Sequence, residues 1–369
     1  MSGDDVERVL AEALDAQARA RVRADVAPPL PRFAGAPTES QRAARPRRAW
    51  LAPAAAAAVV VAIVGLVLGL TRAGPAKRPV AAGSTAHSSA SSVRSATPAV
   101  PAAPVAVTKP VRMRVTTDSG ATYGVGMPVV VLISHRITDA RAFQRATNVT
   151  VDGHAVDADW YFEPSTRQKG YPLEAHLRTR TYWRAHARVY VSLAAHGVSA
   201  GDGYHFADDA QLSFFTGAAM ISTVDDRTHV MTVRRDDKVI DKFPVSLGAK
   251  KTPTARGTKV VMSKGASICM HGPGYDECGI KDTQRLTYGG EYLHSAPWNV
   301  SNIDRGVDSS NGCTNMLPSD AAAFYAQSEV GDVVRFPNSN GPTMTAGAGL
   351  GDWNVSWSTW LRGGVVPTH

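Results

Sequence analysis

The chain has 369 residues, enough for two folded domains with further segments outside them, because single domains usually contain about 100–200 residues. Its 40 lysines and arginines against 32 aspartates and glutamates give a net charge of +8, and both signs are scattered along the chain. The sequence contains no basic stripe interleaved with aromatic residues, no zinc-finger spacing and no glycine-rich phosphate loop. These features argue against nucleic-acid binding, whereas a basic protein also suits an anionic cell surface.

The first segment, residues 1–48, is predicted to be cytoplasmic. Its stretch "DDVERVLAEALDAQARARVRADV" places apolar residues at helical spacing, and two aspartates lie near its start, where the helix dipole favours negative charge. We expect a short amphipathic helix here. It is either solvated on all sides or docked to a partner, and a partner would point to a role in membrane signalling.

Residues 49–71, "AWLAPAAAAAVVVAIVGLVLGLT", carry no charge. As a helix this run reaches ~34 Å, enough for a hydrocarbon layer of ~30 Å. A buried core helix is disfavoured because the run is apolar on every face. A cleaved signal peptide is disfavoured because the polar segment before it is too long, and no cysteine follows to accept a lipid. The sequence predicts one transmembrane anchor.

The charges around this run set its expected orientation. Four arginines precede it closely and three basic residues follow, which weakly favours a cytoplasmic N-terminus. Residues 72–110 consist mainly of Ala, Ser, Pro and Gly and cannot bury enough apolar surface to fold. We expect a linker that holds the remaining chain outside the cell membrane, at the cell wall.

Two β-rich regions follow. Residues 111–217 contain short runs such as "MPVVVLIS" and "ARVYVSLAA", separated by Gly, Asp and Asn, which predicts a β-sandwich. Residues 218–337 begin with "HVMTVRRDDKVIDKFPVSLG", two alternating runs joined across Asp236-Asp237, which predicts a hairpin. Their helical stretch, "LPSDAAAFYAQSEV", offers Ser319 or Asp320 as a cap. The expected fold is mainly β with few helices.

Residues 338–369 form a Trp-rich C-terminal extension. Trp353, Trp357 and Trp360 in "GLGDWNVSWSTWLRGG" fall at helical spacing. We expect them to pack on the domain formed by residues 218–337, and stacking on carbohydrate is the alternative.

The three cysteines are Cys269, Cys278 and Cys313, and in an oxidising compartment an odd count leaves one without an intramolecular partner. Cys269 and Cys278 are close in sequence and are the natural pair. Two buried thiols, or a metal site that also uses His271, are the alternatives, although the C-x-H-x6-C spacing matches no zinc pattern. With Cys269 and Cys278 paired, Cys313 is the free thiol.

Cys313 is a candidate nucleophile if an imidazole lies close to it, because a cationic imidazole lowers the pKa of a thiol. His294 in "EYLHSAPW" is the best candidate, since it lies at the end of an expected strand. Pro297 and Gly312, which restrict or shape the backbone, flank the pair.

The stretch "HSAPWNVSNIDRGVDSSNGCTNMLPSDAAAFY" resembles the active-site signature of the L,D-transpeptidase family: a His, a spacer, then Ser-His-Gly-Cys and an Asn shortly after. The spacer, residues 295–309, falls within the length range of that signature. The resemblance is to the mycobacterial type and includes "TYGVGMPVVVLISHRI", "STVDDRTHVMTVRRDDKVIDKFPVSLG", "TPTARGT" and "GLGDWNVSWSTW", so it covers nearly everything from residue 111 onward. It implies an immunoglobulin-like sandwich followed by an L,D-transpeptidase catalytic domain.

This resemblance implies peptidoglycan 3→3 cross-linking through a cysteine acyl-enzyme. Cys313 is the implied nucleophile, His294 carries the proton, and Ser295 holds the imidazole through its backbone carbonyl. The implied oxyanion and substrate contacts are Gly312, Tyr288, Trp298, Asn315, Asn311 and His271, the last in a flap where a surface position is the alternative. The implied donor is a tetrapeptide stem, the acceptor is a diaminopimelate amine, carbapenems acylate the same thiol, and no metal or organic cofactor is expected.

Asn311 departs from the family pattern, which usually has His at this position. Asn can form hydrogen bonds but cannot carry a proton charge near pH 7. Two hypotheses follow: a working L,D-transpeptidase, which we favour, and a non-catalytic or impaired peptidoglycan-binding protein of the same fold.

Overall fold

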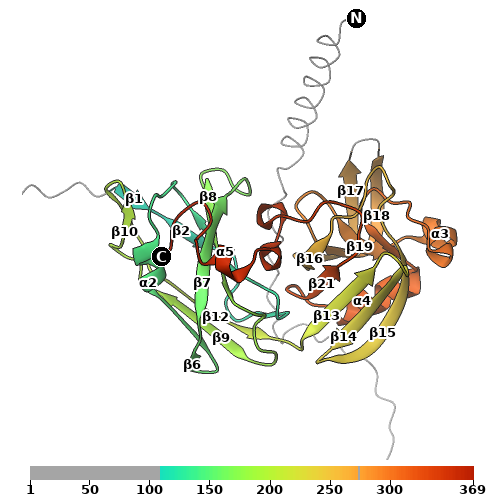
Figure 1. Cartoon of the computed structure of the whole chain (residues 1–369), viewed down its shortest axis with the longest axis horizontal. Coiled ribbons are helices and arrows are strands. Elements are labelled where there is room, and N and C mark those ends of the chain that lie inside the picture. Colours follow the sequence, from blue (N-terminus) through green and yellow to red (C-terminus); the bar gives the residue numbers. More distant parts are fainter. Residues whose placement is uncertain (1–108, 273–274) are drawn as a thin grey trace, which may run out of the picture. The chain divides into compact units, whose positions relative to one another are not determined.

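The computed structural model describes residues 109–272 and 275–369 (Figure 1). The predicted cytoplasmic helix, the apolar run 49–71 and nearly all of the linker lie outside these residues. Among the helices that are described, none combines the length and the apolar character needed to cross a membrane.

The predicted β-sandwich is confirmed in residues 109–217, here called the sandwich domain. One sheet contains β3, β12, β9, β5 and β6 in that order: Thr122–Tyr123, Ala210–Thr216, Arg188–Leu193, Thr147–Val151 and His154–Ala155. The second contains β2, β4, β8 and β7: Met113–Val115, Val129–Ile133, Leu173–Thr179 and Ala158–Pro164. A small third sheet contains β1, β11 and β10: Lys109–Val111, Tyr204–Phe206 and Ser199–Gly201.

Both large sheets contribute to one hydrophobic core. Alternate residues of β4 and of β9 point into it, around Phe143 of the short helix α2 (Arg141–Arg145) and Trp160 of β7. All five residues of β4 are buried, because Val130 on its other face packs with Val260 and Leu350 from later in the chain. A strand covered on both faces loses the alternating pattern of a half-exposed strand.

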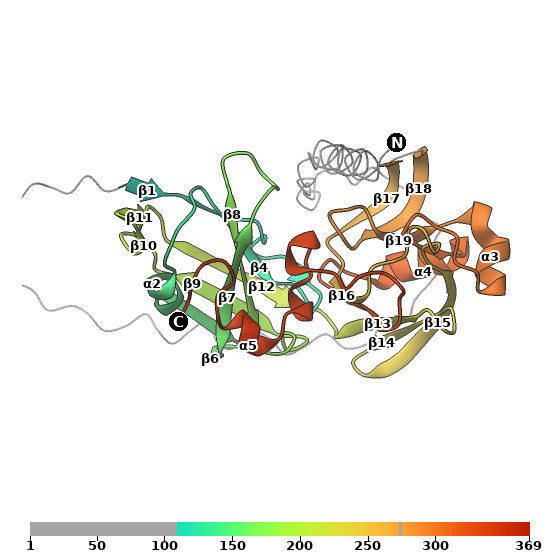
Figure 2. The same cartoon turned by 45° about the horizontal axis from the view of Figure 1, so that its top comes forward.

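Residues 218–337, here called the second domain, form a nine-stranded sheet (Figure 2). Its order is β16, β21, β13, β14, β15, β20, β19, β18 and β17: Gly257–Val260, Val333–Phe336, Met220–Asp225, Val230–Arg235, Lys238–Ser246, Thr314–Met316, Tyr292–Ser295, Tyr275–Arg285 and Ser263–Gly272. The helical elements are η2, α3 and α4: Pro297–Asn299, Val300–Arg305 and Pro318–Gln327.

The hairpin predicted across Asp236-Asp237 is confirmed by the pairing of β14 with β15. Asp236 and Asp237 have φ angles of 47° and 63°, the left-handed pair typical of a two-residue hairpin turn. The predicted cap of α4 is wrong. Its N-cap is Leu317, whose side chain makes no cap bond, and Pro318 occupies the first turn, where the missing N–H of proline costs nothing.

The C-terminal extension, residues 338–369, contains η3, η4 and α5: Ala346–Ala348, Asp352–Asn354 and Trp357–Trp360. Its tryptophans therefore lie on two short helices and not on one. The extension contacts both domains, beyond the packing on the second domain that we expected. The Trp360 indole N–H donates to the Asp159 carbonyl at 2.7 Å in the sandwich domain, and the Asn354 side chain accepts the Thr258 N–H at 2.7 Å in the second.

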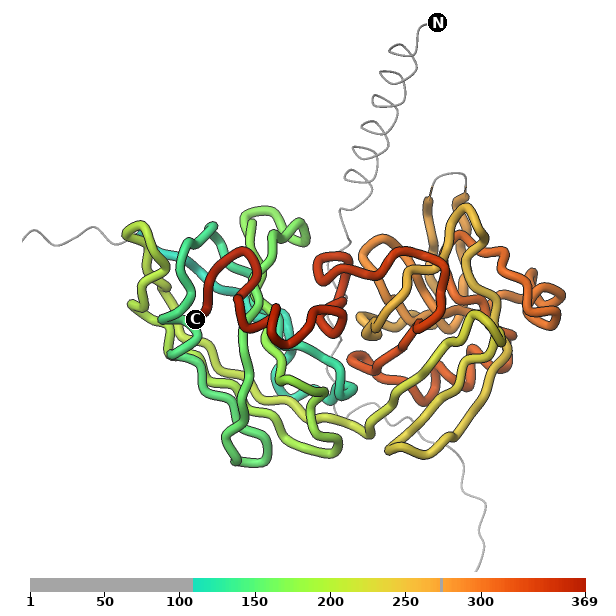
Figure 3. The backbone as a smooth tube through the Cα atoms, viewed as in Figure 1, coloured from blue at the N-terminus to red at the C-terminus, as the bar shows by residue number. Residues whose placement is uncertain are grey.

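The extension also covers a sheet edge. β7 is the last strand of its sheet, and the C-terminal segment, red in Figure 3, runs beside it. On this free side Phe162 forms a bridge with Gly364. The Phe162 N–H donates to the Gly363 carbonyl and the Val365 N–H donates to the Phe162 carbonyl, at 2.9 and 3.0 Å. A covered edge is not open to pairing with another chain.

Candidate active site

Two neighbouring parallel strands position His294 and Cys313. β19 pairs with β20, with His294 opposite Asn315. Cys313 directly precedes β20, at the end of the loop that leads into this strand. His294, Cys313 and Asn315 all line one cavity of about 570 Å³. Trp298 and Asn311, also predicted from the sequence, line it too.

The imidazole of His294 is buried and oriented by its neighbour. Its Nδ1 lies 2.9 Å from the Ser295 carbonyl, which only accepts, so Nδ1 carries the proton and Nε2 keeps its lone pair. Burial lowers the pKa of His294 below its ordinary value, which leaves the ring neutral at pH 7. The exposed Trp298 ring stacks on it, with ring centres 5.9 Å apart.

Cys313 is a free thiol, partly exposed in the cavity. Its Sγ lies 3.6 Å from the Gly290 carbonyl. Burial raises the pKa of Cys313 to about 11, against the smaller lowering effects of the Tyr292 N–H and the Lys259 ammonium. In the ligand-free protein the pair therefore consists of a thiol and a neutral imidazole, which differs from the cationic imidazole that sequence reasoning looked for. Burial disfavours the charged form of both groups.

The turn before Cys313 depends on Gly312 and Ser310. Gly312 has a φ of 110°, a conformation that residues with a Cβ rarely adopt. The Ser310 hydroxyl accepts the Gly312 N–H at 3.1 Å and donates to the Cys313 carbonyl at 2.6 Å. The Thr254 hydroxyl donates to the Gly312 carbonyl at 2.9 Å. The Gly312 N–H, an implied oxyanion donor, is thus engaged by Ser310 in this state.

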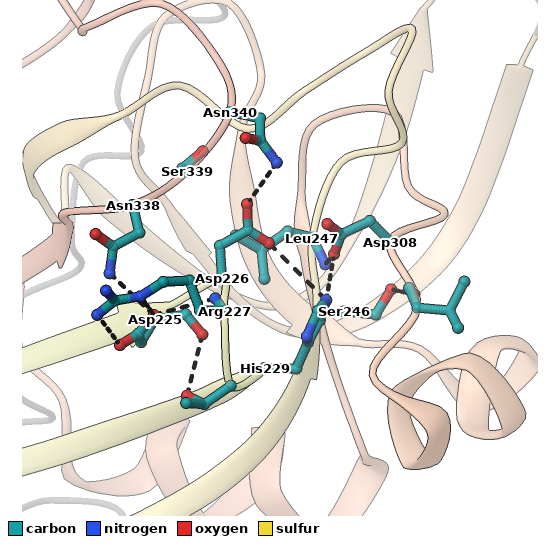
Figure 4. Close-up of polar contacts among 12 residues, drawn as sticks. Asp225, Asp226, Arg227, His229, Ser246, Leu247, Asp308, Asn338, Ser339 and Asn340 are labelled. Carbon is teal, nitrogen blue, oxygen red and sulfur yellow. Dashed lines mark hydrogen bonds and ion pairs between the residues drawn. The ribbon is translucent and has the colours of Figure 1, made fainter.

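Asp308 anchors the start of the same loop (Figure 4). Its Oδ1 accepts the Leu247 N–H at 2.8 Å and lies 3.2 Å from Nε2 of His229. Asp226 approaches the same nitrogen, with its Oδ1 3.9 Å from Nε2. Burial, and then the neighbouring Asp308, raise the pKa of Asp226 to about 6. Sequence reasoning missed this cluster because His229 and Asp308 meet only through the fold.

A buried ion pair beside Cys313 was also missed. The Lys259 side chain is fully buried, and its Nζ lies 2.5 Å from Oε2 of Glu291. The other carboxylate oxygen of Glu291 accepts the Ala255 N–H at 2.8 Å. Burial lowers the pKa of Lys259, while the Glu291 carboxylate opposes that change. The only indication of this pair in the sequence is the position of Lys259, directly before two valines in a strand that the fold buries.

A hairpin of β17 and β18 forms another wall of the cavity through Met270, Tyr275, Glu277 and Ile280. A disulfide joins Cys269 to Cys278 across these strands, the pairing expected from their spacing. Because both sulfur atoms are used in this bond, they do not form the alternative metal site with His271. The hairpin therefore holds cavity residues next to a covalent cross-link.

Two implied site residues lie away from the cavity lining. His271 is exposed, and its Nδ1 lies 2.7 Å from Asp276 Oδ1. The Tyr288 hydroxyl is buried near Glu163 and Glu174 of the sandwich domain, and the Arg167 guanidinium lies 5.1 Å from the centre of its ring. The structure thus brings His294, Cys313, Asn315, Trp298 and Asn311 together, but not His271 or Tyr288.

Residues 220–336 match the L,D-transpeptidase catalytic domain model YkuD, and residues 81–199 match the bacterial Ig domain model Big_10. The chain is similar to L,D-transpeptidase 2 of Mycobacterium tuberculosis (strain CDC 1551 / Oshkosh), with 31% identity over 68% of this chain and 61% of that protein. It is similar to L,D-transpeptidase 5 of M. tuberculosis (strain ATCC 25618 / H37Rv), with 29% identity over 71% of this chain. The chain thus spans 61% and 58% of the length of these two curated relatives.

L,D-transpeptidase 1 of M. tuberculosis (strain ATCC 25618 / H37Rv) is 30% identical over 60% of this chain and 82% of its own length. Among solved structures, an LD transpeptidase in complex with imipenem is 29% identical, with a TM-score of 0.49 over 60% of this chain and 97% of that chain.

Proposed function

Because the chain belongs to the L,D-transpeptidase family, we propose that it forms 3→3 cross-links between peptidoglycan stem peptides through an acyl-enzyme on Cys313. The single observation that carries this proposal is the placement of the free Cys313 thiol and the neutral His294 imidazole in one cavity. A nucleophile and a base that face one cavity are the parts that acyl transfer requires.

In the first step Cys313 Sγ attacks the carbonyl of the peptide bond before the terminal D-Ala of the donor tetrapeptide. Nε2 of His294 takes the thiol proton during this attack, because a thiol with a pKa of about 11 is not ionised at rest. The imidazolium then gives its proton to the departing D-Ala amine. The products are a thioester on Cys313 and free D-Ala.

The tetrahedral intermediate of this step carries a negative oxygen that requires hydrogen-bond donors. We assign this role to the backbone N–H groups of Cys313 and Gly312. The Gly312 N–H is released from the Ser310 hydroxyl when the substrate oxygen replaces it. Exchange of one acceptor for another keeps the donor satisfied in both states.

In the second step a diaminopimelate side-chain amine of the acceptor stem attacks the thioester. His294 takes a proton from the attacking amine and returns one to the leaving sulfur, so that the thiol is restored and an amide forms. Trp298, Asn311 and Asn315 line the cavity at positions suited to contact the stems. These residues and reactions require no metal or organic cofactor.

We place the catalytic part at the cell wall, held to the cell membrane by the apolar run 49–71 with the N-terminus in the cytoplasm. The disulfide between Cys269 and Cys278 supports an oxidising compartment for this part. Protease added to intact cells should digest residues 109–369 and leave residues 1–48 protected. Protection of both parts would contradict this placement.

The experiment that tests the activity incubates the purified full chain with disaccharide-tetrapeptide and follows products by mass spectrometry. We expect a 3→3 dimer and free D-Ala from the wild type and neither from Cys313→Ala. Equal dimer formation by both proteins would remove Cys313 as the nucleophile.

The second candidate function, a peptidoglycan-binding protein without turnover, is favoured only by Asn311 at the position of the usual His. A carbapenem separates the two, because acylation by a β-lactam needs a competent thiol but no acceptor amine. A Cys313 adduct together with dimer formation supports the transpeptidase. An adduct without dimer formation supports an impaired enzyme, and the absence of both supports the binding protein.

A further inference from the structure

Three buried side chains of the sandwich domain converge far along the chain from the catalytic residues. Glu163 of β7 lies opposite Glu174 of β8, and His176 follows on the same face of β8. Their exposed fractions are 6%, 2% and 0%. One nitrogen of the imidazole and one oxygen of each carboxylate all lie within 4.8 Å of one another.

The ring of His176 is turned toward the two glutamates by a third acid. Nδ1 of His176 lies 2.7 Å from Oδ1 of Asp352, a fully buried residue of η4. A carboxylate accepts, so Nδ1 donates to it and Nε2 is the nitrogen that faces the two glutamates. A histidine held in this way by a carboxylate is the usual arrangement of a metal-binding imidazole.

Nε2 of His176 and Oε1 of Glu163 have no hydrogen-bond partner in the part of the chain that the structure describes. Nε2 lies 3.7 Å from Oε1 of Glu163 and also 3.7 Å from Oε1 of Glu174. An imidazolium donating to either carboxylate is expected at about 2.7–2.9 Å, the kind of contact that Nδ1 makes with Asp352. Two ligand atoms that each lie about 2.0–2.2 Å from one metal ion are about 3.4–3.8 Å apart when the ligand–metal–ligand angle is about 110–130°. The two separations of 3.7 Å fall in this range.

We propose that Glu163, Glu174 and His176 bind one divalent transition-metal ion of the zinc type, with Asp352 as the residue that positions the imidazole. One nitrogen and two carboxylate oxygens suit such an ion better than Mg²⁺ or Ca²⁺, which prefer oxygen ligands alone. The charge of the ion compensates the two buried glutamates. The other oxygen of Glu174 accepts the Ser165 hydroxyl at 3.0 Å, which leaves Oε1 free for the ion.

The bound ion joins two adjacent strands of the sandwich domain, and Asp352 links its imidazole ligand to the C-terminal extension. Glu163 and His176 belong to adjacent strands, and Asp352 belongs to the extension. A second group of similar composition, Asp226, His229 and Asp308, provides a contrast, because its imidazole Nε2 is already within hydrogen-bond distance of Asp308. The metal site is independent of the proposed transpeptidase activity.

The test counts zinc in the purified full chain, refolded with ZnCl₂ and separated from free metal, by inductively coupled plasma mass spectrometry. We expect one zinc per chain. Competition with a chromophoric chelator measures the zinc affinity. Relative to the wild type, we expect it to be at least about 100-fold lower in Glu163→Gln and about 10–100-fold lower in Asp352→Asn. The matched control His229→Gln, and Cys313→Ala, should bind zinc like the wild type.

Thermal unfolding supplies a second readout. Equimolar zinc should raise the Tm of the wild type and leave that of Glu163→Gln unchanged, because a ligand of the native state stabilises it. Glutamine has nearly the same shape and size as glutamate and removes one of the buried charges, so the metal-free variant is expected to fold. Glu174→Gln provides a second isosteric variant.

Three outcomes would overturn the proposal. They are a wild type that binds no more zinc than Glu163→Gln and Glu174→Gln, zinc that is lost with His229→Gln or Cys313→Ala, and equal stabilisation of every variant by Mg²⁺. The first outcome would show that the cluster holds no metal.

Discussion

The proton carried by Cys313 at rest determines how the acylation rate should depend on pH. The pKa of Cys313 is raised to about 11 and that of His294 is lowered, so both groups are neutral around pH 7. Below the pKa of His294 the ring is protonated and cannot accept the thiol proton. Above that pKa the base is available, and no required group is lost until far more alkaline pH.

We therefore expect the rate of carbapenem acylation to rise with pH in the acid range and to remain level from about pH 7 to 9. His294→Ala should lower the acylation rate at pH 7 by a factor of about 10²–10⁴. Without this base the rate should rise steadily with pH between about pH 7 and 9, because it then depends on ionisation of the thiol. Stopped-flow absorbance at saturating carbapenem measures both proteins. A wild-type rate that falls between these pH values would show that the reaction starts from a preformed thiolate and imidazolium.

Asn311 lines the cavity but is exposed, and its side chain carries no proton charge. We expect Asn311→His to change carbapenem acylation by less than about tenfold, which corresponds to about 1.4 kcal/mol in the barrier. Dimer formation from disaccharide-tetrapeptide should change by a similar factor. A large gain in dimer formation with unchanged acylation would mean that the native residue limits transfer to the acceptor amine. Asn311→Gln controls for the larger side chain.

At this scale, the sequence was sufficient for residues that belong to one local motif. His294, Ser295 and Cys313 follow from the stretch 294–315. Lys259 does not, because a lysine is buried only with a charged partner, and Glu291 becomes that partner through folding. Tyr288 shows the opposite failure: its sequence position was compatible with the cavity, but its ring lies beside Arg167.

The loop that carries Cys313 is an element without regular hydrogen bonding, so its side-chain anchors matter. Asp308 accepts the Leu247 N–H and contacts His229. We expect Asp308→Ala to lower the free energy of unfolding by about 1–3 kcal/mol, because a buried N–H loses its acceptor. Asp308→Asn keeps an acceptor and should cost less. Urea unfolding measures both, and equal costs would contradict the role of the acceptor.

Element types were easier to predict than their ends. The hairpin at Asp236-Asp237 was predicted because alternation and turn residues agree locally. The start of α4 was not, since the helix begins at Pro318, before Ser319 and Asp320, and has no side-chain cap. Trp353, Trp357 and Trp360 have helical spacing in the sequence, but the non-helical Val355 and Ser356 separate two short helices.

Across the whole molecule, Trp360 is the side chain on which the extension depends. It is fully buried, donates to the Asp159 carbonyl and lies 4.1 Å from the Arg178 guanidinium. We expect Trp360→Ala to lower the free energy of unfolding by about 3–5 kcal/mol. The matched control is Trp298→Ala, whose ring is 62% exposed and whose loss should change stability by less than about 0.5 kcal/mol. Similar values for the two variants would contradict this assignment.

The domain order and the mainly β character could be inferred from composition and alternation. Contacts between segments far apart in sequence could not, because no local pattern records which surface a segment will meet. Trp360 was expected on the second domain, yet its indole N–H found an acceptor in the sandwich domain. A buried Trp needs both a large apolar surface and such an acceptor.

The covered edge of β7 also constrains how the protein matures. Phe162 receives its outer partner only from Gly364, and the nearby hydrogen bond from Trp360 to Asp159 spans 201 residues. At about 5–20 residues per second, a ribosome adds this stretch in about 10–40 s. During that interval the sandwich domain exists with an open strand edge, so its final packing is completed only after residue 364 has been synthesised.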